Sequence, residues 1–599
     1  EVDSVSIHDN FFELGGDSII TIQMVSRARR AGYELQVGDV FTYQTIARLS
    51  GLMDQRAGAT NTASGEQYEL TGNCGMLPIQ KWYFEKDFAD ISYFNQSVYL
   101  EVDKKVGEPA IKRAIEQLTE HHDSLRFKYF RKEGEWLQSY SEQQNWELIH
   151  KDLRDQPLET LEAGIKTAVD SCQQSLDIEK GEILKVLWIQ TPASEASNRL
   201  LVVVHHLAVD GVSWRIILTD MEQILAAIVE GRKTDLGLKT TSYRQWFEAL
   251  QTFSESEKIK EQLNYWYAIG KDPYRIPVDK EAAIPVKTEA LKQLSLKLDA
   301  AATRNFLSEV PKVYKTEAND LLLAALAKAV CNWSSHNYVV IGMEGHGREQ
   351  LGEGIDTSRT VGWFTTHYPV KLTIEPEDQS GDLIRNVKEQ LRRIPDKGLG
   401  YGVLKYLAKD EVLLNAAAPE IVFNYLGQTD NIIENGKYLK LNAAHTGAPR
   451  SENYPVHEKI SITAVVQNGE LSFNWNYSSL HFEGTTILNL ANDVKEHLLD
   501  LIEHCTSKSD IQATVSPSDL GFGQEVSFRQ LDAFLNEDID GQPRKDLIEG
   551  IYPLSGLQQG MLFHSLYDDA GYVNQFWCDL IDPDTSHLEM ALVHVMQSH

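Results

Sequence analysis

The 599-residue chain has few cysteines and no pattern that would pair them. Its five cysteines are scattered, without a CxxC pair or the spacing of metal ligands: Cys74, Cys172, Cys331, Cys505 and Cys578. This usage is typical of a reduced cytosolic protein and argues against a disulfide framework or a structural zinc site.

Long apolar runs and an excess of positive charge are also missing. No run approaches the roughly 20 residues that span a bilayer, and no signal peptide opens the chain. The formal net charge is −30, which argues against non-specific binding to nucleic acid or to an anionic membrane. We therefore expect a cytoplasmic protein with no nucleic-acid and no membrane partner.

What is present is an ordinary globular composition, 42% hydrophobic and 24% charged. A length of 599 residues predicts a multidomain protein, since domains average roughly 100–200 residues. The first residue is not Met and the last segment stops in mid-pattern, so we expect a piece of a longer polypeptide.

The most informative stretch is a valine-rich apolar run, 200–204, that leads directly into His205 and His206. The run has the length and composition of a strand buried on both faces. Asp210 and Gly211 then predict a turn, and apolar residues recur at helical spacing after it. Histidine is the side chain best suited to proton transfer near neutral pH. An isolated pair of histidines, however, is more often part of a packed core than of a catalytic site.

A second pair, His121 and His122, is followed by Asp123. It ends a predicted helix near 107–120 and precedes a strand-like segment, 124–130. A helix C-terminus favours histidine through its dipole. We therefore assign this second pair a structural role.

An acidic turn, Glu344–Glu349 (EGHGRE), follows another predicted strand, Tyr338–Met343. Its glycines let the backbone approach a ligand closely. Alone, such a cluster is more often a salt-bridged loop than a site. If this turn and the histidine turn face one cleft, a carboxylate and an imidazole can act as base and acid on a weakly acidic C–H bond. Burial would then raise the pKa of the carboxylate towards neutrality.

The first 53 residues predict a small helical carrier bundle in which two glycines and Asp17 precede Ser18 at a helix start. The plain alternative for Ser18 is an N-cap. A helix N-terminus also favours phosphate, and LGGDSI (14–19) resembles the attachment motif of peptidyl carrier domains. The resemblance implies 4′-phosphopantetheine on Ser18, within a partial carrier domain (1–53) that lacks its first helix. The polar stretch 54–67 predicts a flexible linker.

From about residue 68 to 505 the pattern predicts a large α/β unit. Seven of its motifs, in order, resemble those of the epimerization domains of nonribosomal peptide synthetases. They are LPIQ (77–80), the histidine turn (205–211), NDLLLAA (319–325), EGHGRE (344–349), RTVGWFT (359–365), PDKGLGYG (395–402) and FNYLGQ (423–428). The resemblance implies two chloramphenicol-acetyltransferase-like lobes, at about 68–275 and about 285–505, with the histidine turn at their junction. It also implies a tunnel through which the carrier arm reaches in.

Residues 506–550 are polar and predict a second linker. The segment 551–599 contains YPLSGLQQGML (552–562), which echoes MLPIQKW (76–82) and resembles the truncated start of a condensation domain. The resemblance implies three partners. The chain's own upstream carrier domain would be the substrate, and an upstream adenylation domain and a downstream condensation domain would lie outside this fragment.

The resemblance implies a reaction in which an L-aminoacyl or peptidyl thioester on the arm becomes an L/D mixture by removal and return of its Cα proton. We assign proton transfer to Glu344 and His206, without deciding which works on which face. His205 and Asp210 would hold the turn, with Arg348 as a partner for Asp210. Further supporting or pocket residues are Ser213, Asn424 and Tyr425. Neither a metal nor pyridoxal phosphate is required.

Two other functions stay open at this point. A condensation domain, which forms peptide bonds, shares the HHxxxDG core (205–211), whereas the EGHGRE and FNYLGQ motifs favour epimerization. An inactive module that recruits another enzyme to the carrier would be expected to have lost the histidine pair or Glu344, and both are present.

Overall fold

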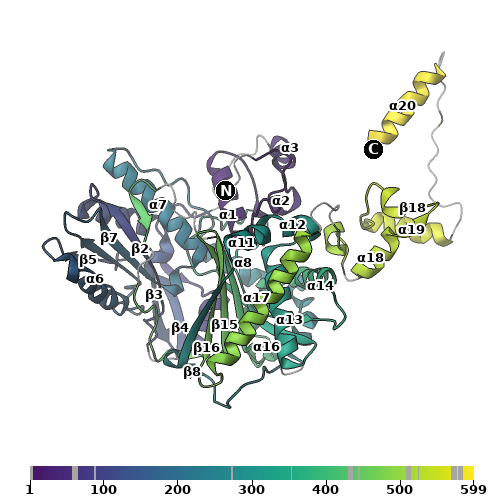
Figure 1. Ribbon diagram of the computed structural model, residues 1–599. Helices are drawn as coiled ribbons and strands as arrows, with labels where there is room; N and C mark the ends of the chain where they lie inside the picture. Colours follow the sequence, from purple (N-terminus) through teal and green to yellow (C-terminus); the bar gives the residue numbers. More distant parts are fainter. Residues whose placement is uncertain are drawn as a thin grey trace. The chain divides into compact units, whose positions relative to one another are not determined.

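The computed structural model forms two compact units, Glu1–Ser516 and Pro517–His599, each described here by itself (Figure 1). The described residues are 5–56, 65–86, 90–271, 274–352, 354–428, 436–442, 446–507, 514–523, 525–567, 577, 580 and 584–598.

The chain begins with short helices that form the predicted small bundle. They are α1 (Ser18–Arg30), α2 (Val37–Thr42) and α3 (Ile46–Arg56). Helix α1 begins at Ser18 because the Asp17 carboxylate accepts a hydrogen bond from the Ile20 N–H at 2.7 Å, which caps the helix. The bundle has a small core of its own, formed by Val25, Leu35, Val40 and Leu49.

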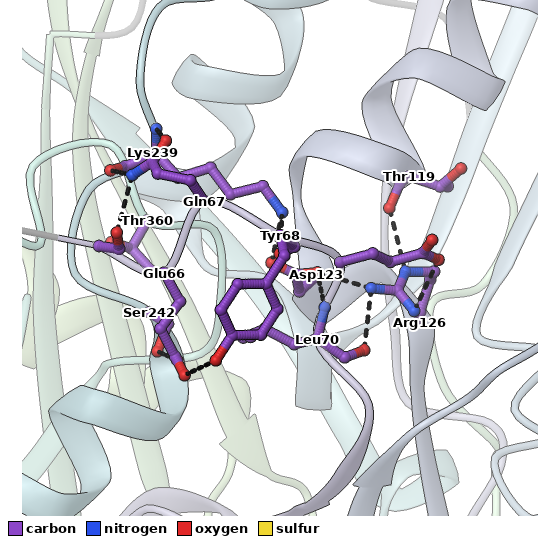
Figure 2. Close-up of polar contacts among 12 residues, drawn as sticks. Glu66, Gln67, Tyr68, Leu70, Thr119, Asp123, Arg126, Lys239, Ser242 and Thr360 are labelled. Carbon is purple, nitrogen blue, oxygen red and sulfur yellow. Dashed lines mark hydrogen bonds and ion pairs between the residues drawn. The ribbon is translucent and has the colours of Figure 1, made fainter. Parts of the chain in front are cut away.

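The end of the predicted linker makes specific polar contacts with the large domain (Figure 2). The Glu66 carboxylate accepts a hydrogen bond from the Ser242 hydroxyl at 2.6 Å, and the Gln67 side chain donates to the Lys239 carbonyl at 2.9 Å. The Lys239 ammonium in turn pairs with Asp123 at 2.9 Å. This network fixes the chain where it enters the large domain.

The prediction of a flexible linker over residues 54–67 is therefore wrong at both of its ends. Helix α3 continues to Arg56, and residues 65–67 are held by the network of Figure 2. Residues 57–64 lie outside the described part of the chain. The sequence overestimated the linker because small polar residues also cap helices and anchor chain segments.

The framework of the first unit consists of two larger sheets (Figure 1). The five-stranded sheet has the order β13-β2-β7-β6-β5, with β2 (Asn95–Asp103), β5 (Glu147–Asp152), β6 (Leu184–Gln190), β7 (Ser197–His205) and β13 (Leu439–Leu441). The six-stranded sheet has the order β11-β10-β12-β15-β16-β9, with β9 (Leu291–Lys297), β10 (Tyr338–Gly345), β11 (Thr366–Thr373), β12 (Ile421–Gln428), β15 (Ile460–Gln467) and β16 (Glu470–Ser478). Smaller pairings join β1 (Gly72–Cys74), β3 (Phe127–Lys132) and β4 (Glu135–Tyr140), and β8 (Val286–Lys287) with β14 (Pro455–Val456).

Helices cover these sheets, and each sheet contributes to a separate large core. With the first sheet are α4 (Pro78–Glu85), α5 (Glu108–His121), α6 (Leu158–Gln173), α7 (Gly211–Val229), α8 (Tyr243–Ser254), α9 (Glu257–Lys260) and α10 (Leu263–Gly270). With the second are α11 (Ala300–Ser308), α12 (Val310–Tyr314), α13 (Ala318–Ser334), α14 (Ser380–Arg392) and α17 (Gly484–Thr506). The buried leucines of α15 (Leu399–Gly402) and α16 (Glu411–Leu414) belong to the first core. Figure 1 shows α13, α14 and α17 grouped together, and their contacts form one side of the second core.

Most predicted elements are present with shifted ends. Strands β15 and β16 are joined by a tight two-residue turn at Asn468-Gly469, where both residues have positive φ, 51° and 73°, as such a turn requires. Strand β3 begins at Phe127 rather than 124, because Asp123–Arg126 form a short 3₁₀ turn first. Strand β10 continues to Gly345, so Glu344 lies on a strand and not in the predicted turn.

The division into two lobes along the sequence is crossed by a strand. Strand β13 lies within the predicted C-lobe, yet it pairs antiparallel with β2, with Leu439 opposite Val102. A segment of the later half thus completes the edge of the earlier sheet. A run of three residues was too short to reveal this pairing in the sequence.

The second unit contains short elements. They are α18 (Phe528–Leu535), β17 (Asp538–Ile539), β18 (Gln542–Pro543), α19 (Gly556–Tyr567) and α20 (Thr585–Ser598). Leu531 on α18 is buried, whereas Leu557 and Leu566 on α19 are largely exposed. Across the described ranges of both units, no helix combines the length and the apolar character needed to cross a membrane.

Candidate functional site

A cavity of about 290 Å³ lies in the first unit and is lined by elements of both sheets. His206 reaches it from the turn after β7, and Glu344 reaches it from β10. The wall nearest to these two residues is completed by Trp82 on α4, Trp363 in the segment before β11, and His367 on β11. The structure thus brings together the two residues to which the sequence assigns proton transfer.

Hydrogen bonds fix the tautomer of His206. Its Nδ1 lies 2.8 Å from the Val209 carbonyl oxygen, which only accepts, so Nδ1 carries the hydrogen. Its Nε2 lies 2.9 Å from the Gln96 amide nitrogen. The Gln96 oxygen is occupied by the Trp214 indole N–H at 2.8 Å, so the Gln96 N–H donates to Nε2. Nε2 therefore holds the lone pair.

Aromatic rings hold the plane of the His206 imidazole. Phe94 stacks on it at 5.2 Å between ring centroids, and Trp363 lies 4.3 Å away on a tilted plane. Because these rings exclude water, burial lowers the pKa of His206 below its usual range, while the charges of Glu344 and Asp210 oppose that change. The resting imidazole is neutral.

His205 faces the core and does not line the cavity. Its Nε2 lies 3.0 Å from the Ile91 carbonyl oxygen, and its Nδ1 accepts from the Leu207 N–H at 3.2 Å. Burial lowers the pKa of His205 to about 3, so this imidazole stays neutral. These contacts fit the holding role that the sequence suggested for it.

Asp210 joins the histidine turn to two other motifs. Its carboxylate accepts from the Ser213 N–H at 2.7 Å, which caps α7, and from Arg348 at 3.2 Å. It also accepts from the Phe364 N–H at 3.1 Å. The Ser213 hydroxyl donates to the Gly362 carbonyl at 2.8 Å. The turn at 205–211, EGHGRE and RTVGWFT are thereby locked into one arrangement.

Glu344 is held by one hydrogen-bond donor on each oxygen. His367 Nε2 lies 3.2 Å from Oε1, and the Asn424 amide donates to Oε2. Burial on its own raises the pKa of Glu344, but the hydrogen bond and charge of His367 and the charge of His206 outweigh it. The net pKa lies below the ordinary value, so the predicted rise towards neutrality is wrong. Glu344 is a carboxylate at rest.

Sequence reasoning missed His367 and Gln96. Each lies directly across a strand pair from a recognised segment: His367 is opposite Glu344, and Gln96 is opposite Val204, two residues before His206. Such neighbours are set by strand register, which local patterns do not reveal.

Comparisons with known proteins agree with this architecture. Residues 72–519 match the family model described as "Condensation domain", and residues 1–53 match "Phosphopantetheine attachment site". The chain belongs to the condensation-domain family. A phosphopantetheine carrier domain therefore precedes a condensation-family domain, as in a fragment of a nonribosomal peptide synthetase.

Among curated relatives, linear gramicidin synthase subunits D and B of Brevibacillus parabrevis are 36% and 38% identical to the chain over 605 and 610 residues. These alignments cover 100% of this chain but 12% and 11% of those proteins, so the chain spans about a tenth of their length.

Among solved structures, the epimerization domain from the third module of tyrocidine synthetase B is 35% identical, with a TM-score of 0.69. It matches over 74% of this chain and 99% of that one. The first condensation domain of the CDA synthetase, at 15% identity and a TM-score of 0.55 over 74% and 99% of the two chains, shows a shared fold alone.

A second cavity, of about 70 Å³, lies between the carrier domain and the condensation-family domain, at the loop that precedes Ser18. Gly15, Gly16 and Asp17 form its carrier side, and Tyr425 on β12 forms part of the other side. Tyr425 thus lies away from the cavity that holds Glu344, where we expected a pocket wall. Its neighbour on the strand, Asn424, points to Glu344 instead.

The residues of this second cavity fit a phosphopantetheine arm. Thr316 Oγ1 and Asn319 Oδ1 are buried there and have no hydrogen-bond partner among the described residues. The arm carries amide N–H groups, which are the donors that such oxygens lack. A neighbouring buried cation, Arg215, donates to the Gln428 carbonyl at 3.0 Å and interacts with the charge of Asp17.

The other histidine pair lies elsewhere in the condensation-family domain. His122 Nε2 lies 3.0 Å from the fully buried carboxylate of Asp220, which also pairs with Arg359 at 2.6 Å and with Arg30 of the carrier at 3.1 Å. Desolvation of Asp220 favours a higher pKa, yet the His122 hydrogen bond and the charge of Arg359 lower it overall. The helix dipole was an incomplete reason for this pair. Within the described residues, no group of three or more His, Cys, Asp or Glu side chains forms a metal-binding cluster.

Proposed function

We propose that the condensation-family domain epimerizes the α-carbon of an aminoacyl or peptidyl thioester carried by the arm on Ser18, during nonribosomal peptide synthesis. The observation that carries the proposal is that an ionised carboxylate, Glu344, and a neutral imidazole, His206, line one cavity. The similarity to the epimerization domain of tyrocidine synthetase B, which the chain covers almost completely, supports it.

The chemistry needs a base and an acid on opposite sides of one carbon. A thioester acidifies its α-hydrogen because the electrons of the broken C–H bond delocalise onto the thioester oxygen as an enolate. Glu344 is ionised and hydrogen-bonded, so it can accept the proton without first losing one. Return of a proton to the opposite face restores the C–H bond with inverted configuration. One proton leaves and one returns, and no oxidant or reductant takes part.

His206 is the second group in this scheme. In its neutral form, Nε2 offers a lone pair that is shared only with a Gln96 N–H. Neither group holds a transferable proton at rest, so the proton that returns to Cα comes from solvent. When one of the two residues accepts the Cα proton, a solvent-derived proton carried by the other residue, or by a water beside it, returns to the opposite face, and the first residue then releases its proton to solvent. The product of such a reversible exchange is a mixture of L and D thioesters.

The arm supplies a covalent tether and the thioester that activates the substrate. Thr316, Asn319 and Tyr425 would hold it along the second cavity, between Asp17 and β12. An adenylation domain upstream would load it, and a condensation domain downstream would consume the product. The described cysteines are buried and form no disulfide with one another, which fits a cytoplasmic location.

Condensation is the second candidate, because the matching family model is that of the condensation domain and the histidine turn is common to both activities. Glu344, with a partner on each carboxylate oxygen in the cavity, favours epimerization. Peptide-bond formation requires no second base at that position.

The test is a Cα exchange assay on the holo-protein, with Ser18 loaded with an aminoacyl or a peptidyl thioester in deuterated water. We expect deuterium uptake at Cα and a mixture of L and D residues, measured by mass spectrometry and chiral analysis. Glu344→Gln keeps the shape and removes the base, so we expect a loss of about 10²–10⁴-fold.

Glu349→Gln is the matched control, since Glu349 belongs to the same motif but pairs with His346 at 3.3 Å and does not line the cavity. It should retain exchange within about tenfold. The epimerase proposal would fail if the wild type took up no deuterium from any loaded substrate, or if Glu344→Gln exchanged at the wild-type rate. Peptide-bond formation with an added aminoacyl carrier would instead identify condensation.

A further inference from the structure

We propose that His367 is a positioning residue for Glu344, which keeps this carboxylate ionised inside the cavity and turns it towards the substrate carbon. The proposal rests on the epimerization proposed above, and it adds a residue outside every motif recognised in the sequence. The contact of a second imidazole with the catalytic carboxylate carries it.

The strand register puts the two side chains on the same face of the sheet. Glu344 on β10 is directly opposite His367 on β11 in an antiparallel pair. Directly opposed residues have neighbouring Cβ atoms, so their side chains meet. His367 Nε2 lies 3.2 Å from Glu344 Oε1. Because a carboxylate only accepts, Nε2 carries the hydrogen whether the imidazole is neutral or charged.

The other side of the His367 ring is held by a helix that packs with the five-stranded sheet. Trp82 on α4 meets it edge to face at 4.7 Å between centroids. The ammonium of Lys86 lies 5.0 Å above the same indole, so this ring is itself fixed. His367 therefore has one favoured orientation, with Nε2 towards Glu344.

The two partners of Glu344 differ in kind. Asn424 donates from a neutral amide, which orients Oε2 but adds no charge. His367 both donates and can become a cation, and within the described residues it forms the ion pair of Glu344. Without it, a carboxylate in a cavity walled by aromatic rings would be protonated more readily.

Other charged groups reach the same cavity from neighbouring elements, and none of them has a hydrogen bond or ion pair to Glu344 among the described residues. His206 acts on Glu344 through its charge. The remaining titratable or charged side chains of the lining are Lys86, Lys405, Arg450, His457 and Glu458, together with Tyr368, Tyr401, Tyr406 and Tyr454. His367 is thus the titratable group whose removal changes the surroundings of Glu344 most directly.

The experiment measures Cα deuterium exchange against pH for the holo-protein and for His367→Met and His367→Gln. Methionine removes the hydrogen-bond donor of Glu344, so the acidic limb of the pH–rate profile should move to higher pH. We expect a rate at least about fivefold below the wild type at pH 6, returning to within about twofold at pH 8.5. Glutamine keeps a donor without charge and should give an intermediate limb.

His457→Met is the matched control, because it removes a histidine from the same cavity that has no contact with Glu344, and its acidic limb should stay where the wild type has it. A uniform loss of rate at all pH values in His367→Met, or an unmoved limb, would overturn the proposal and leave His367 a packing residue.

A second readout separates this proposal from the proposed function. Infrared difference spectra of ¹³C-glutamate-labelled protein, with Glu344→Gln subtracted, report the titration of the Glu344 carboxyl directly. If the wild type shows no Cα exchange, epimerization fails, yet a Glu344 titration that moves to higher pH in His367→Gln still supports the role of His367. An unmoved titration in both variants contradicts it.

Discussion

The chain contains two adjacent histidine pairs, His121-His122 and His205-His206, and their surroundings differ in one respect. His122 is closed off: its imidazole contacts the buried carboxylate of Asp220, which two arginines also bind. His206 is open: its ring is wedged between aromatic side chains beside a cavity of about 290 Å³.

The comparison teaches that the partner, and not the histidine, decides the role. A carboxylate already saturated by cations fixes His122 as part of a structural network. The Val209 carbonyl and the Gln96 amide fix only the orientation of His206. Its Nε2 lone pair can therefore react with a molecule that enters the cavity. The carboxylate that lines the same cavity as His206 is Glu344, which lies on the other large sheet.

The largest effect should come from truncating the two histidines in turn. His206→Ala removes a proton-transfer group, so we expect Cα exchange to fall by about 10²–10⁴-fold with a near-normal unfolding midpoint. His122→Ala should keep exchange within about tenfold and lower stability instead. The measurements are deuterium uptake and urea unfolding. Loss of Cα exchange in a folded His122→Ala protein would contradict the structural role assigned to His122.

The next effect is on folding, at the partner of His122. Asp220→Ala leaves His122, Arg359 and Arg30 without their common carboxylate in a fully buried position. Removing one member of a buried ion pair costs about 3–5 kcal/mol of unfolding free energy. Urea unfolding measures it, with Glu230→Ala, at an exposed acid just after the same helix, as the control. A loss below about 1 kcal/mol would contradict the prediction.

The smallest effect is on the pH dependence of stability. Burial lowers the pKa of both His121 and His205 from the ordinary 6.5 to about 3. The unfolded chain takes up protons on them as the pH falls through 6.5, whereas the native protein does so only near 3. Stability present above pH 6.5 is therefore lost as the pH falls towards 3, at up to about 1.4 kcal/mol per pH unit for each fully buried imidazole.

His205→Gln should make this pH dependence shallower by the contribution of one imidazole. Urea unfolding at pH 7, 6 and 5 checks it, since carboxyl groups titrate mainly below this range. Equal slopes for His205→Gln and the wild type would show that His205 is protonated in the native state.

Local patterns predicted much of this site. The strand into His205 depends on neighbours within a few residues, and the structure has it. The N-cap of α1 is Asp17, whereas the sequence had offered Ser18 as the N-cap. The ion pair of Asp210 with Arg348 is also present, at 3.2 Å. This ion pair could be predicted because the motifs that contain Asp210 and Arg348 had both been recognised in the sequence.

What the sequence did not predict depends on register between distant segments. The pKa of Glu344 is lowered and not raised because His367, on the next strand, outweighs burial. Tyr425 faces the cavity beside the carrier because neighbouring side chains on a strand point to opposite faces, and Asn424 takes the side of Glu344. A motif identifies the strand but not its faces.

Strand β13 has a consequence for synthesis on the ribosome. Strand β2 gains its partner β7 once residue 205 has been made, but its other edge waits for residues 439–441. At roughly 5–20 residues per second, that edge stays open for on the order of 10–50 s, with unpaired N–H and C=O groups along Leu100–Val102. The nascent chain is most prone to mispair with another strand during this interval, which ends before synthesis reaches Asn476, the last residue that lines the larger cavity.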